Sequence, residues 1–213
     1  MKKLTAAMLL ASACTATAAQ AEAGDVIVRL RAIVVAPNEK SDLTPDDVKL
    51  TNDVVPEIDF TYMLTNNIGA ELIAATSKHK VSGGSAVAGA SVPLASTYAL
   101  PPTLTLQYHL APQAAIRPYV GVGVNYTIFY SSKPSSVVET AFGQTKVHIK
   151  DSIGYALQAG VDIDLTKKFF LNFDVKYIDM TAKTSLRTTL AGTVKTKIEV
   201  RPFVFGVGFG TRF

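Results

Sequence analysis

Acidic and basic residues occupy every second position in several apolar segments of this sequence. Arg29 and Arg31 alternate with apolar neighbours in one segment, and Glu57 and Asp59 do so in another. If these segments are β-strands, alternate side chains share a face, so the charges in each segment point the same way. Guanidinium and carboxylate groups that meet away from water form charge-assisted hydrogen bonds, because an isolated buried charge is costly. The spacing therefore indicates ion pairing inside a closed structure.

Catalytic and metal-binding chemistry has little support in the sequence. His79 and His148 fall in predicted loops, and His109 faces inward near a predicted turn. None has the serine and aspartate company that a catalytic triad needs, and their spacing is not that of a metal site. We therefore predict neither an enzyme nor a bound cofactor or metal ion.

Composition excludes two further classes of protein. The chain of 213 residues has a mean hydropathy of +0.24 but no long apolar run after its first twenty residues. This pattern excludes a bundle of transmembrane helices. Without Lys2 and Lys3 the chain carries 19 bases and 17 acids, a net charge of +2, and no basic stripe is visible along it. We therefore predict no nucleic-acid partner.

The amino terminus has the three regions of a secretory signal peptide. Met1–Lys3 is basic, Leu4–Ala13 is apolar, and Ala19–Ala21 supplies the small residues of a cleavage site. We predict a signal peptide over residues 1–21 and a single mature domain over residues 22–213. Cleavage after Ala23 is a weaker second choice.

The only cysteine in the sequence, Cys14, lies inside this leader. A lipoprotein signal would acylate Cys14, but Ala11 stands where such a signal wants leucine. The mature chain is therefore expected to have no thiol and no disulfide.

Apolar and polar residues alternate with period two from Val26 to the end of the sequence, which predicts β-strands. The eight predicted strands cover residues 28–34, 54–64, 68–74, 103–110, 117–129, 153–164, 169–177 and 203–213. Long connections follow the odd-numbered strands, at 37–52, 77–98, 131–150 and 180–195, and the third has room for a short helix. Short turns follow the even-numbered strands, at 65–67, 111–115 and 166–168.

This asymmetry is typical of outer-membrane barrels. The predicted fold is all-β: an eight-stranded antiparallel transmembrane β-barrel with long extracellular loops and short periplasmic turns, set in the lipid of the bacterial outer membrane. A soluble β-sandwich is the alternative, but nothing in that fold requires long and short connections to alternate.

The last strand has large residues on one face and glycines on the other. Phe205, Val207, Phe209 and Phe213 are expected to face the lipid, and the glycines between them to face a crowded interior. This aromatic ending resembles the C-terminal signal that the barrel-assembly machinery reads, although Thr211 departs from the pattern. Just before this strand Glu199 and Arg201 share the parity of the outward Phe203, so the alternation slips at Pro202, which predicts a bulge there.

Seven stretches spread over nearly all the predicted strands share a common resemblance. They are Val34–Pro37, Thr61–Thr76, Leu100–Leu104, Arg117–Thr127, Asp151–Ser152, Gln158–Asp162 and Arg212–Phe213. Together they resemble the OmpW family of small outer-membrane proteins. The resemblance implies an eight-stranded barrel that passes small hydrophobic molecules across the outer membrane, with related members importing alkanes. Phe203, Thr211 and Lys176 stand where family members carry, or can carry, larger or aromatic residues.

Inward-facing charges are predicted to form a plug in the lower and middle barrel. Six acids and five bases have this parity: Arg29, Arg31, Glu57, Asp59, Glu71, Arg117, Asp162, Asp164, Asp174, Lys176 and Arg212. An eight-stranded barrel is only wide enough for side chains, so each charge must find a partner. We expect the plug to close the periplasmic half to water and ions.

Inward-facing apolar residues are predicted to form a vestibule above this plug. They are Ile33, Ile73, Phe129 and Ile178. Pro101 and Pro102, near the start of the fourth strand, remove two ladder donors and could leave a lateral opening, or they could simply end the preceding loop.

The resulting hypothesis is a narrow hydrophobic passage for small apolar molecules, which leave sideways into the membrane. Two alternatives stay open. The apolar residues could merely fill a solid barrel, or the protein could be a structural or partner-binding barrel whose lumen has no role.

Overall fold

The computed structural model describes residues 22–41, 48–84 and 91–213. The predicted signal peptide, with Cys14, lies outside the described residues. So do parts of the predicted connections at 37–52 and 77–98.

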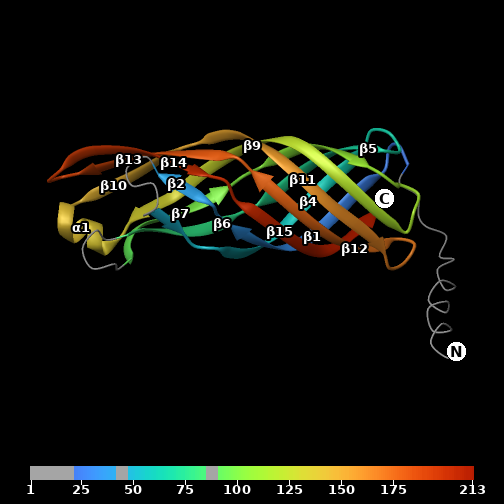
Figure 1. The fold of residues 1–213 in the computed structure, drawn as a ribbon, viewed down its shortest axis with the longest axis horizontal. Coiled ribbons are helices and arrows are strands. Elements are labelled where there is room, and N and C mark those ends of the chain that lie inside the picture. Colours follow the sequence, from blue (N-terminus) through green and yellow to red (C-terminus); the bar gives the residue numbers. More distant parts are fainter. Residues whose placement is uncertain (1–21, 42–47, 85–90) are drawn as a thin grey trace, which may run out of the picture.

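Eight antiparallel strands form a closed barrel, which confirms the predicted fold (Figure 1). In spatial order they are β11 (Ser152–Asp164), β12 (Phe169–Ile178), β15 (Phe203–Arg212), β1 (Val26–Ala36), β4 (Asp53–Met63), β5 (Ile68–Ala75), β8 (Thr103–His109) and β9 (Ile116–Pro134). The pairing of β9 with β11 closes the ring, so these strands have no free edge.

The two faces of each strand are as the alternation predicts. On β1, the outward Leu30 is 62% exposed, whereas its neighbours Arg29 and Arg31 are 0% and 2% exposed. Phe209 on β15 is 61% exposed, and its glycine neighbours face inward. A broad apolar outer face around a polar interior suits a barrel whose surroundings are lipid. No helix in the described part of the chain is long and apolar enough to span a membrane.

Short turns join the strands at one end of the barrel. Thr65 Oγ1 accepts hydrogen bonds from the backbone of Asn67 and Ile68, at 3.2 and 3.0 Å, and thereby closes the β4–β5 turn. Thr166 Oγ1 does the same for Lys168 and Phe169 between β11 and β12. Local side-chain acceptors of this kind stabilise tight turns. The other end, which carries α1, is called the upper end here.

The predicted long connections are largely strands that extend the wall upward, so their prediction as loops was wrong. β9 continues past the ring and pairs with β7 (Ser91–Leu100), which pairs with β6 (Ser77–Gly84) and through it with β3 (Val48–Leu50). A second sheet has the order β10 (Thr145–Lys150), β13 (Met180–Thr188), β14 (Gly192–Val200) and β2 (Glu39–Ser41). The outward positions of these strands are polar, so their composition resembles that of loops.

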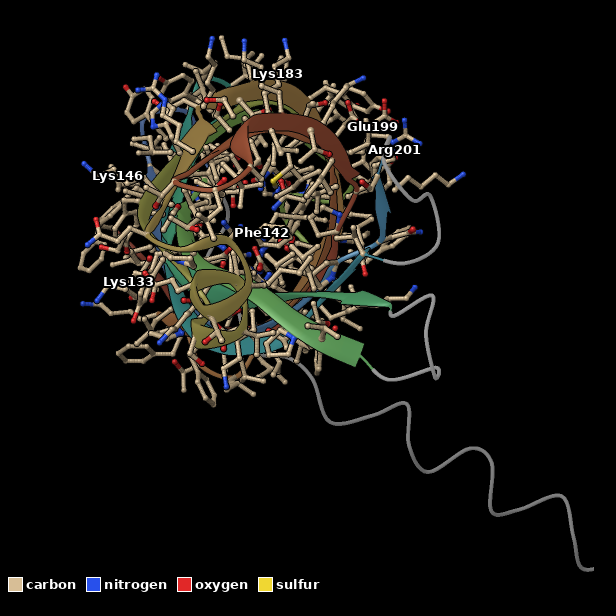
Figure 2. All side chains as sticks on the ribbon, turned by 90° about the vertical axis from the view of Figure 1, so that its left-hand side faces the viewer. Lys133, Phe142, Lys146, Lys183, Glu199 and Arg201 are labelled. Carbon is tan, nitrogen blue, oxygen red and sulfur yellow. The ribbon has the colours of Figure 1, made fainter. Side chains whose placement is uncertain are left out.

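The short helix expected in the third connection is present as α1 (Ser136–Phe142). Ser135 caps it, because its side chain accepts a hydrogen bond from the backbone of Val138. Gly143 ends it with a φ of 72°, a conformation that favours glycine. α1 lies across the upper opening, and its Phe142 is seen over the middle of the barrel in Figure 2.

The predicted bulge at Pro202 is absent. Val200, Pro202 and Val204 are buried and face inward, so the alternation runs unbroken from β14 into β15. The outward Glu199 and Arg201 lie above the apolar band, where water reaches charged side chains. The slip in the sequence pattern has another cause. Outward residues change from apolar to charged at this height because the outer face passes from lipid to water, while the strand geometry stays the same.

Close packing of β15 against β1 generates a testable prediction. A Cβ on Gly208 would meet the Leu30 carbonyl oxygen and the Arg31 backbone, neither of which can move freely. We expect Gly208→Ala to lower the free energy of unfolding by roughly 1–3 kcal/mol through overpacking. Urea unfolding in lipid vesicles measures this change.

Gly206→Ala on the same strand is the matched control. Its Cβ would lie 3.2 Å from side-chain atoms of Arg31 and Ile33, which can shift. Equal unfolding midpoints for the two variants would contradict the packing described for Gly208.

Candidate functional site

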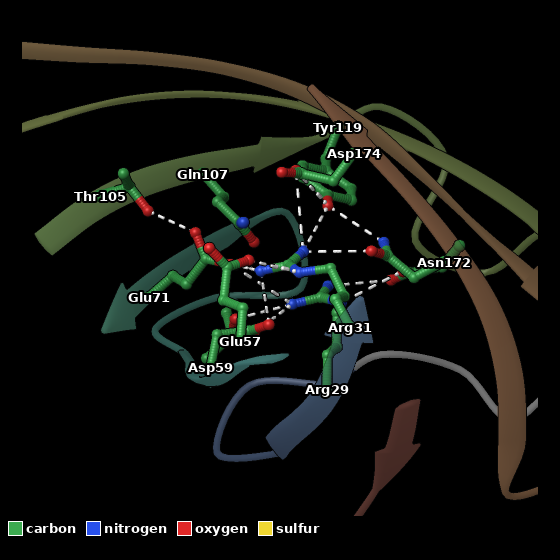
Figure 3. A network of polar contacts seen from close by, with 12 residues as sticks. Arg29, Arg31, Glu57, Asp59, Glu71, Thr105, Gln107, Tyr119, Asn172 and Asp174 are labelled. Carbon is green, nitrogen blue, oxygen red and sulfur yellow. Dashed lines mark hydrogen bonds and ion pairs between the residues drawn. The ribbon is translucent and has the colours of Figure 1, made fainter. Parts of the chain in front are cut away.

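The pairing of β1 with β4 places opposite charges directly across from each other. Arg29 stands opposite Asp59, and Arg31 stands opposite Glu57. Cross-strand neighbours on one face are within contact distance, so each arginine meets a carboxylate from the adjacent strand. Glu71 of β5 and Asp174 of β12 then converge on these two arginines across the narrow lumen (Figure 3). Asp162 of β11 also reaches Arg29.

Arg29 joins three strands through one guanidinium group. Its Nε and Nη2 donate to the two carboxylate oxygens of Asp162, at 3.2 and 2.9 Å. Its Nη1 donates to Asp59 and to Thr61, at 3.0 and 2.9 Å. The guanidinium carbon also lies 5.2 Å from the centre of the Tyr119 ring. A bidentate contact of this type fixes the geometry as well as the charge.

Arg31 has the largest number of acidic partners in this part of the lumen. Its Nε donates to Glu57 at 2.8 Å, and its Nη2 lies 2.5 Å from Asp59 and 3.3 Å from Glu71. Its Nη1 is 3.7 Å from Asp174. The side chain is fully buried, so the ion pairs replace its lost hydration.

Lys176 completes the arrangement from β12. Its Nζ lies 2.8 Å from Glu57 and 2.5 Å from Asp174, and it is buried. This lysine therefore neutralises two carboxylates at the upper edge of the cluster. We name as the central network the eight charged residues joined by these ion pairs: Arg29, Arg31, Glu57, Asp59, Glu71, Asp162, Asp174 and Lys176.

Neutral donors offset the excess of acids in the central network, which holds three bases and five acids. Thr105 donates to Glu71 at 2.6 Å, and Asn172 donates to Asp162 at 2.8 Å. Asp174 accepts from Tyr119 and Gln158, at 2.9 and 2.8 Å. These neutral residues were not among the predicted site residues, although their positions in the alternating pattern place them on the inward face.

The three remaining charges of the predicted plug lie lower in the barrel. Arg117 pairs with Asp164 at 2.5 Å, and Arg212 lies at the end of β15, opposite Ile27. The buried ring of Phe170 separates this level from the central network. The guanidinium carbons of Arg29 and Arg117 lie 5.7 and 5.5 Å from its centre. The predicted plug is thus divided into two levels, with an aromatic side chain between them.

A cavity of about 440 Å³ lies above the central network. All four predicted vestibule residues line it: Ile33, Ile73, Phe129 and Ile178. The upper strands and α1 add further apolar side chains, among them Val81, Leu94, Val138, Phe142, Leu186 and Ile198. Glu57 and Lys176 also line the cavity, so the central network forms its floor.

The cavity wall also contains a histidine–serine contact that was not predicted from the sequence. His79 is a buried residue of β6, not a loop residue, and its Nε2 lies 2.9 Å from the Ser77 hydroxyl. Its Nδ1 lies 2.8 Å from the Thr51 carbonyl oxygen, so Nδ1 carries the proton and Nε2 accepts from Ser77. His79 thus has a serine partner but not the aspartate that a catalytic triad also needs. The Nδ1 atom of His79 donates to a backbone carbonyl oxygen and not to a carboxylate.

The other two histidines lie away from this contact. His109 is buried low in the lumen beside Gln107, and His148 is exposed on β10. Within residues 22–41, 48–84 and 91–213, no group of three or more histidine, cysteine or carboxylate side chains could hold a metal ion.

The barrel wall has an interrupted ladder beside the cavity. The pairing of β5 with β8 stops at Ile73 and Thr103, and the pairing of β6 with β7 starts at Ser77 and Ala99, so three residues on each side lie between the two ladders. The register is the same in the two ladders, so residues 74–76 face residues 100–102 across the gap. These residues belong to neither the β5–β8 nor the β6–β7 ladder. We name these two facing segments the seam.

The two prolines explain why the ladder is interrupted. Pro101 and Pro102 have no backbone N–H, and because consecutive residues of a strand point these groups to opposite sides, one of the two missing donors faces the seam. Pro101 lines the cavity, and the Pro102 carbonyl accepts a hydrogen bond from Tyr126 of β9, at 3.0 Å, on its other side. At the prolines the wall thus keeps one backbone hydrogen bond to β9, whereas residues 74–76 and 100–102 belong to neither of the two ladders on the other side.

The burial of Arg31 generates a prediction about stability. We expect Arg31→Leu to lower the free energy of unfolding by about 3–5 kcal/mol, because four buried carboxylates each lose a cation and the central network is left with two bases against five acids. Urea unfolding from lipid vesicles measures this loss.

Arg201→Leu removes the same side chain from an exposed ion pair and serves as the control. Arg201 is 3.0 Å from both Asp179 and Glu199 but 43% exposed. Its loss should cost about 0–1 kcal/mol. A neutral result for Arg31→Leu would mean that water solvates the lumen at this level.

Comparison with known proteins places this geometry in one family. A model of the OmpW family matches residues 22–213. The chain is 35% identical over 220 residues to outer membrane protein W of Escherichia coli, and the match covers 100% of both chains. It is 32% identical over 164 residues to outer membrane protein AlkL of Ectopseudomonas oleovorans, which covers 76% of this chain and 67% of AlkL.

Solved structures agree with the sequence matches. The crystal structure of the outer membrane protein OprG from Pseudomonas aeruginosa has a TM-score of 0.80 at 32% identity, covering 92% of this chain and 99% of OprG. The solid-state NMR structure of AlkL in DMPC bilayers has a TM-score of 0.68 at 26% identity, covering 93% of this chain and 94% of AlkL. The protein is accordingly a β-barrel embedded in the lipid of the bacterial outer membrane, and it belongs to the OmpW family.

Proposed function

We propose that this barrel is a passage for small apolar molecules, which enter the cavity from the upper end and leave sideways through the seam into the membrane. The observation that carries the proposal is an apolar cavity whose floor is a buried network of ion pairs. Its volume of about 440 Å³ lies within the range of small-molecule pockets.

The direction of transfer follows from the solvation of the solute. An apolar solute gains about 0.8 kcal/mol for each CH₂ group removed from water, so the cavity attracts it without a specific polar contact. The central network offers no comparable surroundings, since its carboxylate and guanidinium groups are already paired. Lipid beyond the wall is as apolar as the cavity, so lateral release is the downhill path.

The seam is the part of the wall best suited to that release. It lies directly beside Ile73, one of the cavity residues, and lacks the ladder that joins the strands above and below it. Opening it therefore breaks fewer backbone hydrogen bonds than opening any regularly paired part of the barrel. The segment that faces the prolines across the seam also carries small residues, Ala74 and Ala75.

The carboxyl-terminal strand supports a second proposal, which concerns assembly. Phe205, Val207, Phe209 and Phe213 all face outward and are exposed to the surroundings of the barrel. We infer that this aromatic face is the signal that the barrel-assembly machinery reads after the leader over residues 1–21 has been removed.

A structural or partner-binding barrel with a filled lumen is the competing function. It fits the lower half of the lumen, where side chains pack around the central network. It does not account for the cavity above, and the transport assays below distinguish the two.

A charge in the cavity should slow transfer. Ile73→Asp places a carboxylate on the cavity wall beside the seam, where a passing apolar solute would have to contact it. We expect uptake of an alkane-like or aromatic fluorescent probe by cells to fall on the order of tenfold, the effect of losing about 1.4 kcal/mol of binding free energy.

Ile73→Leu keeps the volume and polarity of the site and is the matched control. Both variants should reach the membrane as folded barrels, as judged by heat-modifiable gel mobility. Equal uptake by cells with the wild-type protein, with Ile73→Asp and with no protein would favour the structural or partner-binding barrel.

Locking the seam should also stop lateral release. Thr76 and Leu100 face each other across the seam in the register of the flanking ladders, so Thr76→Cys with Leu100→Cys can form a disulfide there. The only native cysteine lies in the predicted leader, so no other thiol is expected to compete. We expect oxidation to suppress probe uptake and a reductant to restore it.

The control disulfide joins Val34 and Val54, which face each other in the regular ladder of β1 and β4. Oxidation of this pair should leave uptake unchanged. If the seam disulfide also leaves uptake unchanged, the solute leaves by another route, and the proposed lateral path is wrong.

A further inference from the structure

The outer face of the upper sheet carries a concentration of basic residues that the passage does not use. The pairing of β10, β13 and β14 places Lys150, Lys183 and Lys197 side by side in one row across three strands. Four residues further up this strand pair, Lys146 stands opposite Arg187. All these side chains are exposed, and Figure 2 shows Lys146 and Lys183 pointing away from the barrel.

Like charges at directly paired positions destabilise a sheet, so this arrangement has a cost that a bound anion would reduce. The segments 145–150 and 182–198, which hold these rows, contain no aspartate or glutamate. Lys195 on β14 adds a further base to the same outward face. We name these six residues the basic face: Lys146, Lys150, Lys183, Arg187, Lys195 and Lys197.

Charges just below the basic face are arranged differently. Arg201 lies 3.0 Å from Asp179 and 3.0 Å from Glu199, and Glu199 also pairs with Lys197 of the basic face at 2.7 Å. The hydrogen bond from Lys197 and the nearby charge lower the pKa of Glu199, so this acid stays ionised at neutral pH. Opposite charges thus alternate at this lower level, whereas bases alone occupy the rows above.

The height of the basic face indicates the kind of anion that could reach it. Tyr155, Tyr177 and Phe203 form a contiguous aromatic row on the outer wall, with ring centres 6.1 and 5.4 Å apart. Such rows mark the membrane–water boundary of barrels. Lys183 follows Tyr177 by six residues, which corresponds to about 20 Å along the strand direction. Because barrel strands are tilted, Lys183 lies about 15 Å above the aromatic row.

A phospholipid headgroup does not extend that far. The headgroup region on each side of a bilayer is only about 5–8 Å thick. A membrane lipid can therefore place an anion at the level of Lys183 only on a longer polar group.

We propose that the basic face binds the phosphorylated oligosaccharide headgroup of an anionic glycolipid in the outer leaflet. Arginine and lysine match phosphate oxygens in charge and hydrogen bonding. A glycolipid that lies against the apolar wall presents its headgroup to these bases at high effective concentration. This site is on the outer wall, so the proposal does not depend on the proposed passage through the apolar cavity.

Binding of lipopolysaccharide to the purified barrel in a neutral detergent tests the proposal. The variant K150Q/K183Q/R187Q removes three bases at neighbouring positions of the basic face. At about 1 kcal/mol for each base, we expect its apparent affinity to fall about 100-fold. The loss should shrink in high salt, because exposed charges are screened.

K49Q/K80Q/K133Q is the matched control, since it removes three exposed lysines from β3, β6 and β9 of the same upper barrel. Its affinity for lipopolysaccharide should stay within about threefold of the wild type, on the scale of 1.4 kcal/mol per tenfold change. Urea unfolding provides a second readout: the basic-face variant should be as stable as the wild type or more stable, because like-charge repulsion is relieved.

Further arms identify the source of the anion. Dephosphorylated lipopolysaccharide should bind the wild type and both variants equally weakly. An equal loss of affinity in the two triple variants would overturn the proposal. The proposal would also be overturned if the wild type bound heparin or phosphatidylglycerol vesicles with the same affinity as lipopolysaccharide. The site would then not select a tall phosphorylated headgroup.

Discussion

Neutralising charge inside a narrow lumen is the constraint on which the rest of this structure depends. Eight strands enclose a space that side chains fill, so water cannot hydrate charges that point inward. Arg29, Arg31 and Lys176 are therefore surrounded by carboxylates, and neutral donors such as Thr105 and Asn172 satisfy the remaining oxygens. Because this network spans the barrel, it determines where the cavity can begin and which exits remain.

The same strands meet two different surroundings along their length. In the lower barrel the outer face is apolar, and the polar residues point inward. Above the aromatic row the arrangement reverses, with apolar residues such as Ile198 and Val200 inside and lysines outside. This reversal lets one continuous wall hold an ion-pair network below and an apolar cavity above. It also makes the outer surface basic where it meets the polar zone of the membrane.

Much of the barrel could be predicted from the sequence because period-two alternation identifies both a strand and its two faces. The choice of ion-pair partners could not, since Arg29 and Asp162 are 133 residues apart and meet only through register and barrel closure. The upper strands were missed because their polar outward residues resemble a loop. His79 was missed with them, since its contacts with Ser77 and Thr51 exist only once β6 is recognised as a strand.

The central claim is that apolar solute occupies the lumen only above the ion-pair network. Crystals of the barrel soaked with a long-chain bromoalkane would test it directly, because the anomalous signal of bromine locates the bound chain. The account predicts bromine between Ile33, Phe129 and Ile178, above Lys176, with none at the level of Arg29. Bromine beside Arg29 or Asp162, or bromine on the outer wall alone, would contradict it.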